Sequence, residues 1–298
     1  MFRPRSKTFG FLILGLLVHA TASQADEAEA VKAIKGLGGR IKMDDQRPGQ
    51  PVVSVDLSRT LVTDTGLKEL KELKSLQSLD LSRTQVTNAG LKELTELKSL
   101  QSLDLSFTLV TDAGLKELKV LKNLESLSLD RSLISPRKTY PPITNAGLKE
   151  LKDLKSLQKL NLRGNPVTDA GLRELKELPD LQALDLSRTK VTGAGLGELK
   201  KLKSLRSLSV GYETTYAGLG ALPELKSLQS LVLIEITVTD SSLKELMSLK
   251  GLQSVEFRDT TISEDGLKQL RAALPETKLK FSARQIDHEE RMLRHTSR

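Results

Sequence analysis

Residues 76–99 read LQSLDLSRTQVTNAGLKELTELKS, and this stretch decides the fold of the 298-residue chain. A closely similar stretch begins at Leu100 and another at Leu124, and a step of about 24 residues continues to Phe281. A unit of this size cannot bury its own apolar face, so neighbouring copies must stack around one continuous core. The period therefore predicts a solenoid whose function lies on its surface.

Each unit opens with the pattern LxxLxL, in which residues such as Leu79 and Leu81 alternate with polar side chains. A period of two predicts a strand with one buried face, and the strands of successive units must be parallel. Leucines three positions apart then follow, as at Leu91 and Leu94, and predict a short helix with its charged side outward. The ten predicted strands lie at Val55/Leu57, Leu79/Leu81, Leu103/Leu105, Leu127/Leu129, Leu160/Leu162, Leu184/Leu186, Leu208/Val210, Leu231/Leu233, Val255/Phe257 and Leu279/Phe281.

Two residue types mark the start of each helical segment. A threonine followed by Asp or Asn, as at Thr87 and Thr111, predicts a helix N-cap with a favourable first turn. A glycine recurs in that turn, at Gly90 and Gly114 among others, although glycine costs a helix about 1 kcal/mol relative to alanine. Close approach between one unit and the backbone of the next would offset this cost, so we interpret the glycines as packing residues.

Taken together, the pattern LxxLxLxxTxVTDAGLKEL resembles the leucine-rich repeat in its bacterial TDAGL form, over residues 52–281. The resemblance implies a curved α/β solenoid, with a parallel β-sheet on the concave face and short helices on the convex face. Thr84 and its equivalents replace the asparagine that the family carries after the strand, and only Asn165 retains it. Threonine hydrogen-bonds a turn more weakly, so we expect weaker turns within the same fold.

The chain divides into four predicted segments. Residues 1–25 resemble a secretory signal peptide, with Arg3, Arg5 and Lys7 before a ten-residue apolar run at 9–18 and small residues after it. That run is shorter than the roughly 20 residues that span a membrane, so we expect an exported mature chain with no transmembrane anchor, either periplasmic, envelope-associated or secreted. An N-terminal cap at 26–51 precedes the repeat domain at 52–281, which carries an insertion near 131–143, and a charged tail covers 282–298.

Composition argues against catalysis and against nucleic-acid binding. The three histidines, His19, His288 and His295, fall outside the repeats, so the repeats have no imidazole for acid–base or metal chemistry. The chain has no cysteine, which excludes disulfides and thiolate sites. Removal of the three basic residues of the signal peptide lowers the formal charge from +8 to +5, which is too mild to indicate nucleic acid. We therefore expect no catalytic residue, no cofactor and no metal.

The residue between the two strand leucines of each unit should face away from the core, so these residues form a column across the concave sheet. Its acidic members are Asp56, Asp80, Asp104 and Asp185. The first three would lie about 4.8 Å apart, a like-charge ladder that costs stability unless it is neutralised. The arginines expected to neutralise it, three positions further on, are Arg59, Arg83, Arg131 and Arg188. A site for a cation or a basic partner is the alternative.

The irregular units are better candidates for specificity than the nearly identical ones. The step from the strand to the helix glycine is nine residues at Gly114 but 18 at Gly147, so nine residues are inserted within DRSLISPRKTYPPIT. Insertions in solenoids lie on one edge and often bind partners, and exposed aromatic and basic residues anchor interfaces. The candidate partner-binding residues are Phe107, Arg131, Arg137, Lys138, Tyr140, Lys159, Arg163, Tyr212 and Tyr216. Isolated surface substitutions in drifting repeats are the alternative.

These observations predict a non-catalytic module of an exported protein, which binds a protein or peptide partner through the concave face and the central insertion. A structural or adhesive component of the cell envelope is a second hypothesis. A third is an intracellular adaptor, which would hold if the interpretation of the signal peptide is wrong. The position of the mature N-terminus distinguishes the third hypothesis from the others.

Overall fold

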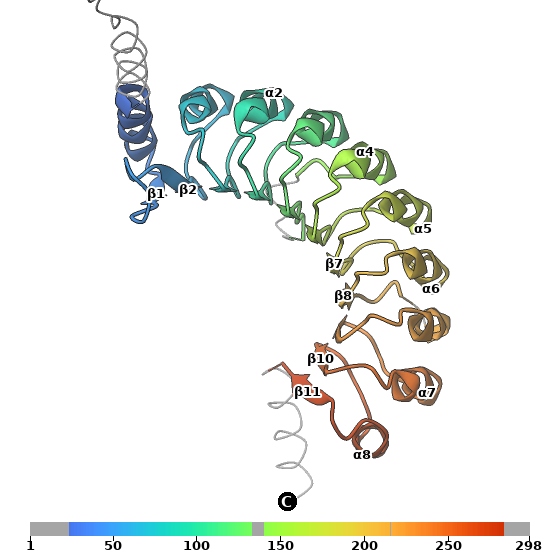
Figure 1. Cartoon of the computed structure of the whole chain (residues 1–298). Coiled ribbons are helices and arrows are strands. Elements are labelled where there is room, and N and C mark those ends of the chain that lie inside the picture. Colours follow the sequence, from blue (N-terminus) through green and yellow to red (C-terminus); the bar gives the residue numbers. More distant parts are fainter. Residues whose placement is uncertain (1–23, 133–139, 215, 283–298) are drawn as a thin grey trace, which may run out of the picture.

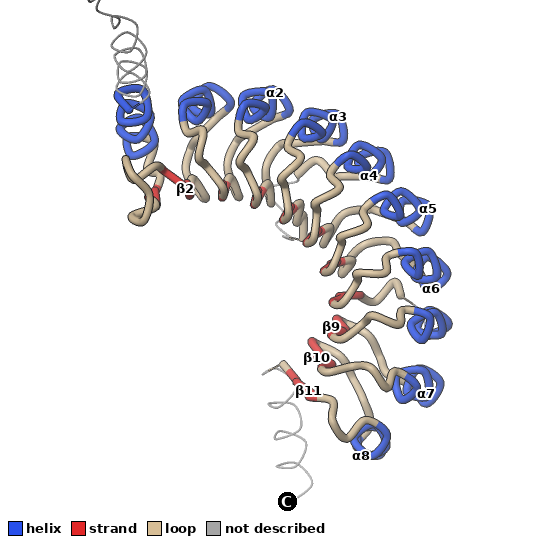
Figure 2. The backbone as a smooth tube through the Cα atoms, in the orientation of Figure 1, coloured by secondary structure: helices blue, strands red, loops and turns tan. Residues whose placement is uncertain are grey.

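The computed structural model describes residues 24–132, 140–214 and 216–282, which form a curved solenoid (Figure 1). Within these residues, eleven strands lie side by side in one sheet and follow the order of the sequence. The sheet lines the inner, concave side of the arc, and the helices form its outer, convex side (Figure 2). The predicted fold class is therefore confirmed.

The ten predicted strands are present and parallel, and they pair without a register shift. Leu79, for example, lies opposite Val55 on one side and Leu103 on the other. Within the predicted N-terminal cap, a further strand, β1 (Arg40–Met43), pairs antiparallel with β2. The parallel strands are β2 (Val52–Asp56), β3 (Ser78–Asp80), β4 (Ser102–Asp104), β5 (Ser126–Ser128), β6 (Lys159–Asn161), β7 (Ala183–Asp185), β8 (Ser207–Val210), β9 (Ser230–Ile234), β10 (Ser254–Arg258) and β11 (Lys278–Phe281).

The convex segments mix α-helical and 3-10 turns. Three residues complete one 3-10 turn, so leucines three apart, such as Leu67, Leu70 and Leu73, stay on one face, and all three are 0% exposed. None of the described helices is both long and apolar enough to cross a membrane. The segments are η1 (Asp64–Glu72), α2 (Asn88–Glu93), η2 (Leu94–Glu96), α3 (Asp112–Leu115), η3 (Lys116–Val120), α4 (Asn145–Glu150), η4 (Leu151–Asp153), α5 (Asp169–Leu172), η5 (Arg173–Glu177), α6 (Gly193–Leu196), η6 (Gly197–Lys201), η7 (Tyr216–Glu224), α7 (Asp240–Ser248) and α8 (Glu264–Ala273).

One cluster of buried apolar side chains runs through the whole arc between sheet and helices. At its N-terminal end, helix 24–36 packs against the first repeat through Ala30 and Ile34, which are at most 1% exposed. The Glu27 carboxylate of that helix accepts a hydrogen bond of 2.6 Å from the Val52 N–H. The helix thus shields an apolar flank that a first repeat would otherwise expose to water.

Hydrogen bonds between helix N-termini join successive repeats. The Asp or Asn that begins one helix accepts a bond from the backbone N–H of the threonine before the next helix, at 2.8 Å for Asp64–Thr87 and 2.9 Å for Asn88–Thr111. The side-chain bond alternates in direction, because the Thr87 hydroxyl donates to Asp64 whereas the Asn88 amide donates to the Thr111 hydroxyl. The steps of this Asx–Thr ladder in the described residues are Asp64–Thr87, Asn88–Thr111, Asp112–Thr144, Asn145–Thr168 and Asp169–Thr192.

The ladder explains why glycine recurs in the first helical turn. A Cβ atom on Gly114 would lie 2.4 Å from Asn88 Oδ1, and one on Gly90 would lie 2.5 Å from Asp64 Oδ1. The predicted packing role is confirmed, but the close neighbour is an Asx side chain and not the backbone of the adjacent repeat. In the repeat after Asp169, Gly193 occupies the Asx position and supplies no side chain for a further step.

The turn after each strand shows the effect of replacing asparagine by threonine. The Thr84 hydroxyl donates to Leu81 O at 2.6 Å, within its own turn. Asn165 instead donates to Leu129 O of the preceding repeat at 2.8 Å and accepts from the Ile143 N–H at 2.9 Å. Asparagine therefore ties two repeats together where this threonine ties one turn, in line with the expectation of weaker turns.

Candidate functional site

The aspartates of the concave column first serve the turn that follows their strand. Asp80 Oδ1 accepts a hydrogen bond of 2.8 Å from the Ser82 N–H, and Asp104 Oδ1 accepts one of 2.7 Å from the Ser106 N–H. Asp56 Oδ1 and Asp185 Oδ1 likewise each accept a hydrogen bond from the N–H of the serine two residues further on. The sequence signal for this role is an Asp two residues before a serine at the end of a strand, because Asp and Asn bond their own backbone two residues on.

The expected neutralisation of the column by arginines three positions later is wrong for the described residues. Asp56 pairs with Arg40 of β1, and Arg188 pairs with Glu235 two repeats away. Arg83 has a φ of 61°, a left-handed conformation that ends the side-chain alternation of the strand. Burial raises the pKa of Asp56, but hydrogen bonds from the following turn and from Arg40 outweigh it, so this pKa is lowered.

The middle of the column keeps its negative charge. Asp80, Asp104 and Asp185 make no ion pair with any other described residue. Burial raises the pKa of Asp104, the charges of Asp80 and Asp130 raise it further, and hydrogen bonds from Ser106 oppose the rise.

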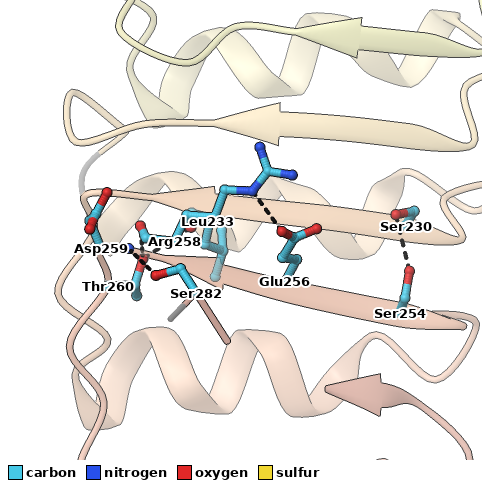
Figure 3. A network of polar contacts seen from close by, with 8 residues as sticks. All are labelled: Ser230, Leu233, Ser254, Glu256, Arg258, Asp259, Thr260 and Ser282. Atoms are coloured by element: carbon cyan, nitrogen blue, oxygen red, sulfur yellow. Dashed lines mark hydrogen bonds and ion pairs between the residues drawn. The ribbon is translucent and has the colours of Figure 1, made fainter. Parts of the chain in front are cut away.

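The C-terminal end of the concave face is satisfied internally (Figure 3). Arg258 Nε donates to Glu256 Oε1 at 2.7 Å, and this hydrogen bond lowers the pKa of Glu256. The Ser254 hydroxyl donates to that of Ser230 at 3.1 Å across the sheet. Polar groups that bond one another in this way have less to offer a partner than the middle of the face.

A shallow groove of about 320 Å³ crosses the middle of the concave face from β5 to β8. Its charged members are Lys159 and Asp185, and neither forms an ion pair with a described residue. The remaining polar and small side chains that line it are Ser126, Ser128, Asn161, Ala183, Ser207 and Ser209. Small side chains let an incoming main chain approach the sheet closely, and the two opposite charges would give it a direction.

Phe107 is only 7% exposed, so its expected exposure is wrong. Tyr140, at the returning end of the insertion, packs edge-on against it, with ring centroids 5.7 Å apart and an interplanar angle of 62°. The Arg83 guanidinium lies 4.9 Å from the centre of the Phe107 ring, in a cation–π arrangement that sequence reasoning missed. We term Arg83, Phe107 and Tyr140 the rim cluster, in which Tyr140 is half-buried and Arg83 is exposed.

Arg131 is 8% exposed and holds the two ends of the insertion together. Its guanidinium donates to Leu105 O at 2.9 Å, to Pro141 O at 3.2 Å and to Val110 O at 3.3 Å. Burial lowers its pKa to about 10, so it stays charged at neutral pH. The expectation that Arg131 belongs to an accessible basic surface is therefore wrong, because backbone carbonyls surround it.

The other predicted partner residues divide by location. Tyr212 is 57% exposed and stands on β8's turn, four strands from that of Phe107, or about 19 Å at 4.8 Å per strand. Phe107 and Tyr212 therefore mark the two ends of the predicted aromatic and basic surface, with Lys159 and Arg163 between them. Arg163 is half-buried beside the groove, and Lys159 lines it. Arg137, Lys138 and the side chain of Tyr216 lie outside the described residues.

The described residues contain no group of three or more His, Cys, Asp or Glu side chains that could hold a metal ion. The concave column accordingly presents its carboxylates singly, one per strand, each engaged with a turn N–H. The cation site considered from the sequence therefore has no ligand set among the residues that the structure describes.

Comparison with known proteins agrees with this geometry. A family model described as leucine rich repeat matches residues 72–94, 96–119 and 153–176. Among solved structures, an internalin, InlF from Listeria monocytogenes, superposes with a TM-score of 0.53 at 20% identity, over 87% of this chain and 76% of that one. The chain is a leucine-rich-repeat protein.

Two further solved structures are more distant in shape. A leucine-rich-repeat protein of Leptospira interrogans is 25% identical, with a TM-score of 0.39, over 72% of this chain and 62% of that one. The plant peptide hormone receptor RGFR1, solved in complex with RGF2, is 18% identical, with a TM-score of 0.47, over 82% of this chain and 40% of the receptor chain. No curated protein sequence matches the chain. The similarity to InlF, at 20% identity, is one of fold alone.

Proposed function

We propose that this protein is a non-catalytic binding module of an exported protein, and that it holds a protein or peptide partner on the middle of its concave face. The groove from β5 to β8 is the observation that carries the proposal. It combines small side chains with one exposed lysine and one carboxylate, whereas both ends of the same face consist of repeated or internally paired groups.

The charges of the groove define what the partner must bring. Lys159 takes an acidic group, and Asp185, one strand across and two residues further along, takes a basic one about 8 Å away. Asp104, held near other negative charges, provides a second position for a basic group. An extended segment that carries an acidic and a basic side chain would satisfy the groove, and such complementarity sets orientation and association rate more than affinity.

The rim cluster supplies a second contact. Tyr140 is held by its edge-on contact with Phe107, so it loses little side-chain entropy on binding, and Tyr and Arg are enriched among interface anchors. Arg131 fixes the insertion beside this cluster through its bonds to the backbone. A partner seated in the groove and extending toward β4 would contact the rim cluster.

The proposal is tested by Ala183→Trp, which fills the groove from β7, against Ala170→Trp on the exposed side of α5. A photo-crosslinking residue at position 159 is introduced into the full chain in its native cell, and crosslinked products are identified by mass spectrometry. We expect one protein or peptide to be crosslinked, and the Ala183→Trp variant to abolish the product while Ala170→Trp retains it.

Two results would count against the proposal. Equal crosslinking by both tryptophan variants would mean that the groove is not the site. Products that consist of polysaccharide, or of many envelope proteins at similar yield, would support a structural or adhesive role instead.

A further inference from the structure

The turns that lead into the strands share one edge of the sheet, because parallel strands all begin at the same edge. Eight of these turns, from the end of η1 to the start of β10, cover 71–75, 95–99, 119–123, 152–156, 176–180, 200–204, 223–227 and 247–251. They carry 13 lysines, six acidic residues and no arginine, and all 13 lysines are exposed. The formal charge of this lysine edge is +7, which exceeds the +5 of the whole chain after residue 25.

Local structure explains some of these lysines. Lys122 Nζ donates to Asp153 O at 3.3 Å and Lys250 Nζ donates to Ala273 O at 2.8 Å, as expected for cations near the carbonyl end of a helix. In the turn at 200–204 it explains Lys200 and Lys201, which end η6, but not Lys203, which lies beside Lys226. The carboxylates paired there are Glu224 with Lys200 and Glu198 with Lys201.

A slot of about 210 Å³, with leucines in its wall and polar groups beside them, opens on the same edge, next to the most basic turn. Leu225 and Leu249 in its wall are each 7% exposed, whereas Leu73 and Leu97 at the same place in earlier repeats are 0% exposed. The slot is lined by Pro223, Leu225, Leu228, Leu249 and Leu252, with Lys226, Ser248, Lys250 and Gly251 at its mouth.

The helices on either side account for the opening. The η7 and α7 segments both contain nine residues, but a 3-10 helix rises about 2.0 Å per residue and an α-helix about 1.5 Å. Their ends therefore differ by roughly 4 Å, and the two turns that follow cannot pack as closely as turns between like helices. Volume for about seven water molecules at ~30 Å³ each is left between the leucines.

We propose that the lysine edge binds an anionic lipid surface, with the slot receiving an apolar segment of a lipid beside Lys203 and Lys226. The lysines are spread over eight turns along one edge of the sheet. This arrangement suits contact with an extended surface better than binding of a small ligand at one position. Lysine acts as a hydrated point charge without the bidentate geometry of arginine, which fits diffuse attraction to headgroups. The eight turns contain no aromatic side chain on which nucleic-acid bases could stack, and a linear polyanion offers nothing to the slot.

Docking by this edge stands apart from the proposed partner site. The edge is formed by the turns before the strands, whereas the rim cluster lies at the opposite ends of the strands and the groove lies on the open face. A chain held by its lysine edge would therefore stand on the lipid surface with its concave face directed sideways and accessible. Failure of either proposal would leave the other intact.

The test is co-sedimentation of the full chain with vesicles of phosphatidylcholine alone and with 30 mol% phosphatidylglycerol, a composition of about one anionic headgroup in three. The edge variant carries K200Q, K201Q, K203Q and K226Q, and the matched control carries K68Q, K92Q, K116Q and K149Q on the convex helices. Each lysine near an anionic surface contributes about fivefold. We expect the edge variant to lower the partition coefficient on anionic vesicles at least tenfold, and the control to lower it much less.

Neutral vesicles report any contribution of the apolar run at 9–18, which all variants share. Binding that is equal on neutral and anionic vesicles, or equal losses in the edge variant and the control, would overturn the proposal. Retention by soluble polyaspartate with no preference for vesicles would also overturn it, in favour of an acidic polymer.

The slot has its own pair of variants at Gly251, where an added Cβ would lie no closer than 3.9 Å to any atom outside its immediate neighbours. Gly251→Ser restores the serine that most repeats carry there, and Gly251→Asp places a carboxylate at the mouth of the slot. We expect G251S to bind anionic vesicles as the parent does and G251D to bind at least threefold less tightly. Equal binding by both variants would exclude the slot from the contact.

Discussion

Replacement of Gly114 by alanine tests whether the Asx–Thr ladder makes glycine necessary. The new Cβ would lie 2.4 Å from Asn88 Oδ1 and 3.0 Å from Asn88 Cγ, so the asparagine must move. It would then lose its bonds to Thr111, of 2.9 Å to the backbone and 2.8 Å to the hydroxyl. Gly197 provides a control, because an added Cβ there meets nothing within 4 Å and its φ of −60° is helical.

The expected magnitude follows from these contacts. Two lost hydrogen bonds cost about 2 kcal/mol, and overpacking costs about 1–3 kcal/mol where the neighbour cannot fully yield. Alanine returns about 1 kcal/mol through its helix propensity. We therefore expect Gly114→Ala to lower the free energy of unfolding by about 2–4 kcal/mol, and Gly197→Ala to raise it by about 0.5–1 kcal/mol.

Urea and thermal unfolding followed by circular dichroism measure both changes, and a change of 1 kcal/mol moves the midpoint by about 2–4 °C in a chain of this size. The double variant Asn88→Ala with Gly114→Ala supplies the decisive comparison. Without the Asn88 side chain, the alanine at position 114 should lower the free energy of unfolding by less. If Gly114→Ala is tolerated as well as Gly197→Ala, or if Asn88→Ala does not reduce its cost, the ladder does not explain the glycines.

Four further predictions address the site and the N-terminal end of the chain. Arg131→Met should lower the free energy of unfolding by at least about 2 kcal/mol, because buried carbonyls lose their donor; a urea midpoint unchanged from the parent would contradict this. Asp104→Asn should leave the free energy of unfolding at pH 7 unchanged or raise it, because it removes a carboxylate whose pKa is raised in the folded chain. The new asparagine can still accept the hydrogen bond from the turn N–H, as Asn161 does in its own turn. Any gain in stability should fade as the pH falls toward 3.8, the ordinary pKa of an aspartate. Asp56→Asn should instead destabilise at pH 7, and the penalty should fade as the pH falls through the lowered pKa of Asp56; midpoints of both variants from pH 7 to 3 give the two signs. Mass spectrometry of protein from its native cell should show an N-terminus near residue 26, and an intact Met1 would end the export hypothesis.

The repeated apolar residues made the fold predictable from sequence. Leu79 and Leu81 identify a strand because alternation places both on the same face, and the fixed step stacks their equivalents. The helical part was predictable as helix but not as 3-10 turns, although a spacing of three residues is the 3-10 period itself. The glycines were identified as packing residues, whereas their partners, such as Asn88, are apparent only once the repeats are superposed in space.

The candidate site was less predictable, because it depends on contacts between irregular segments. Phe107 occupies a column position that arginine holds elsewhere, and nothing in the repeat pattern indicates that Tyr140 returns to cover it. Arg131 looked like another rim arginine, yet the insertion gives it backbone carbonyls to bind. The ion pairs differ from those expected from the sequence for a similar reason, since Arg40 reaches Asp56 from an antiparallel strand that lies outside the repeats.

The alternation in the Asx–Thr ladder bears on how the array arose. Asp64, Asn88, Asp112, Asn145 and Asp169 follow one another as acid, amide, acid, amide, acid. The chemical unit is therefore a pair of repeats of opposite hydrogen-bond polarity, in which every aspartate is insulated from the next by a neutral amide. Duplication of pairs preserves that order, whereas insertion of a single copy would set two carboxylates side by side at one seam. The order from Asp64 to Asp169 is the one that duplication of such pairs would produce.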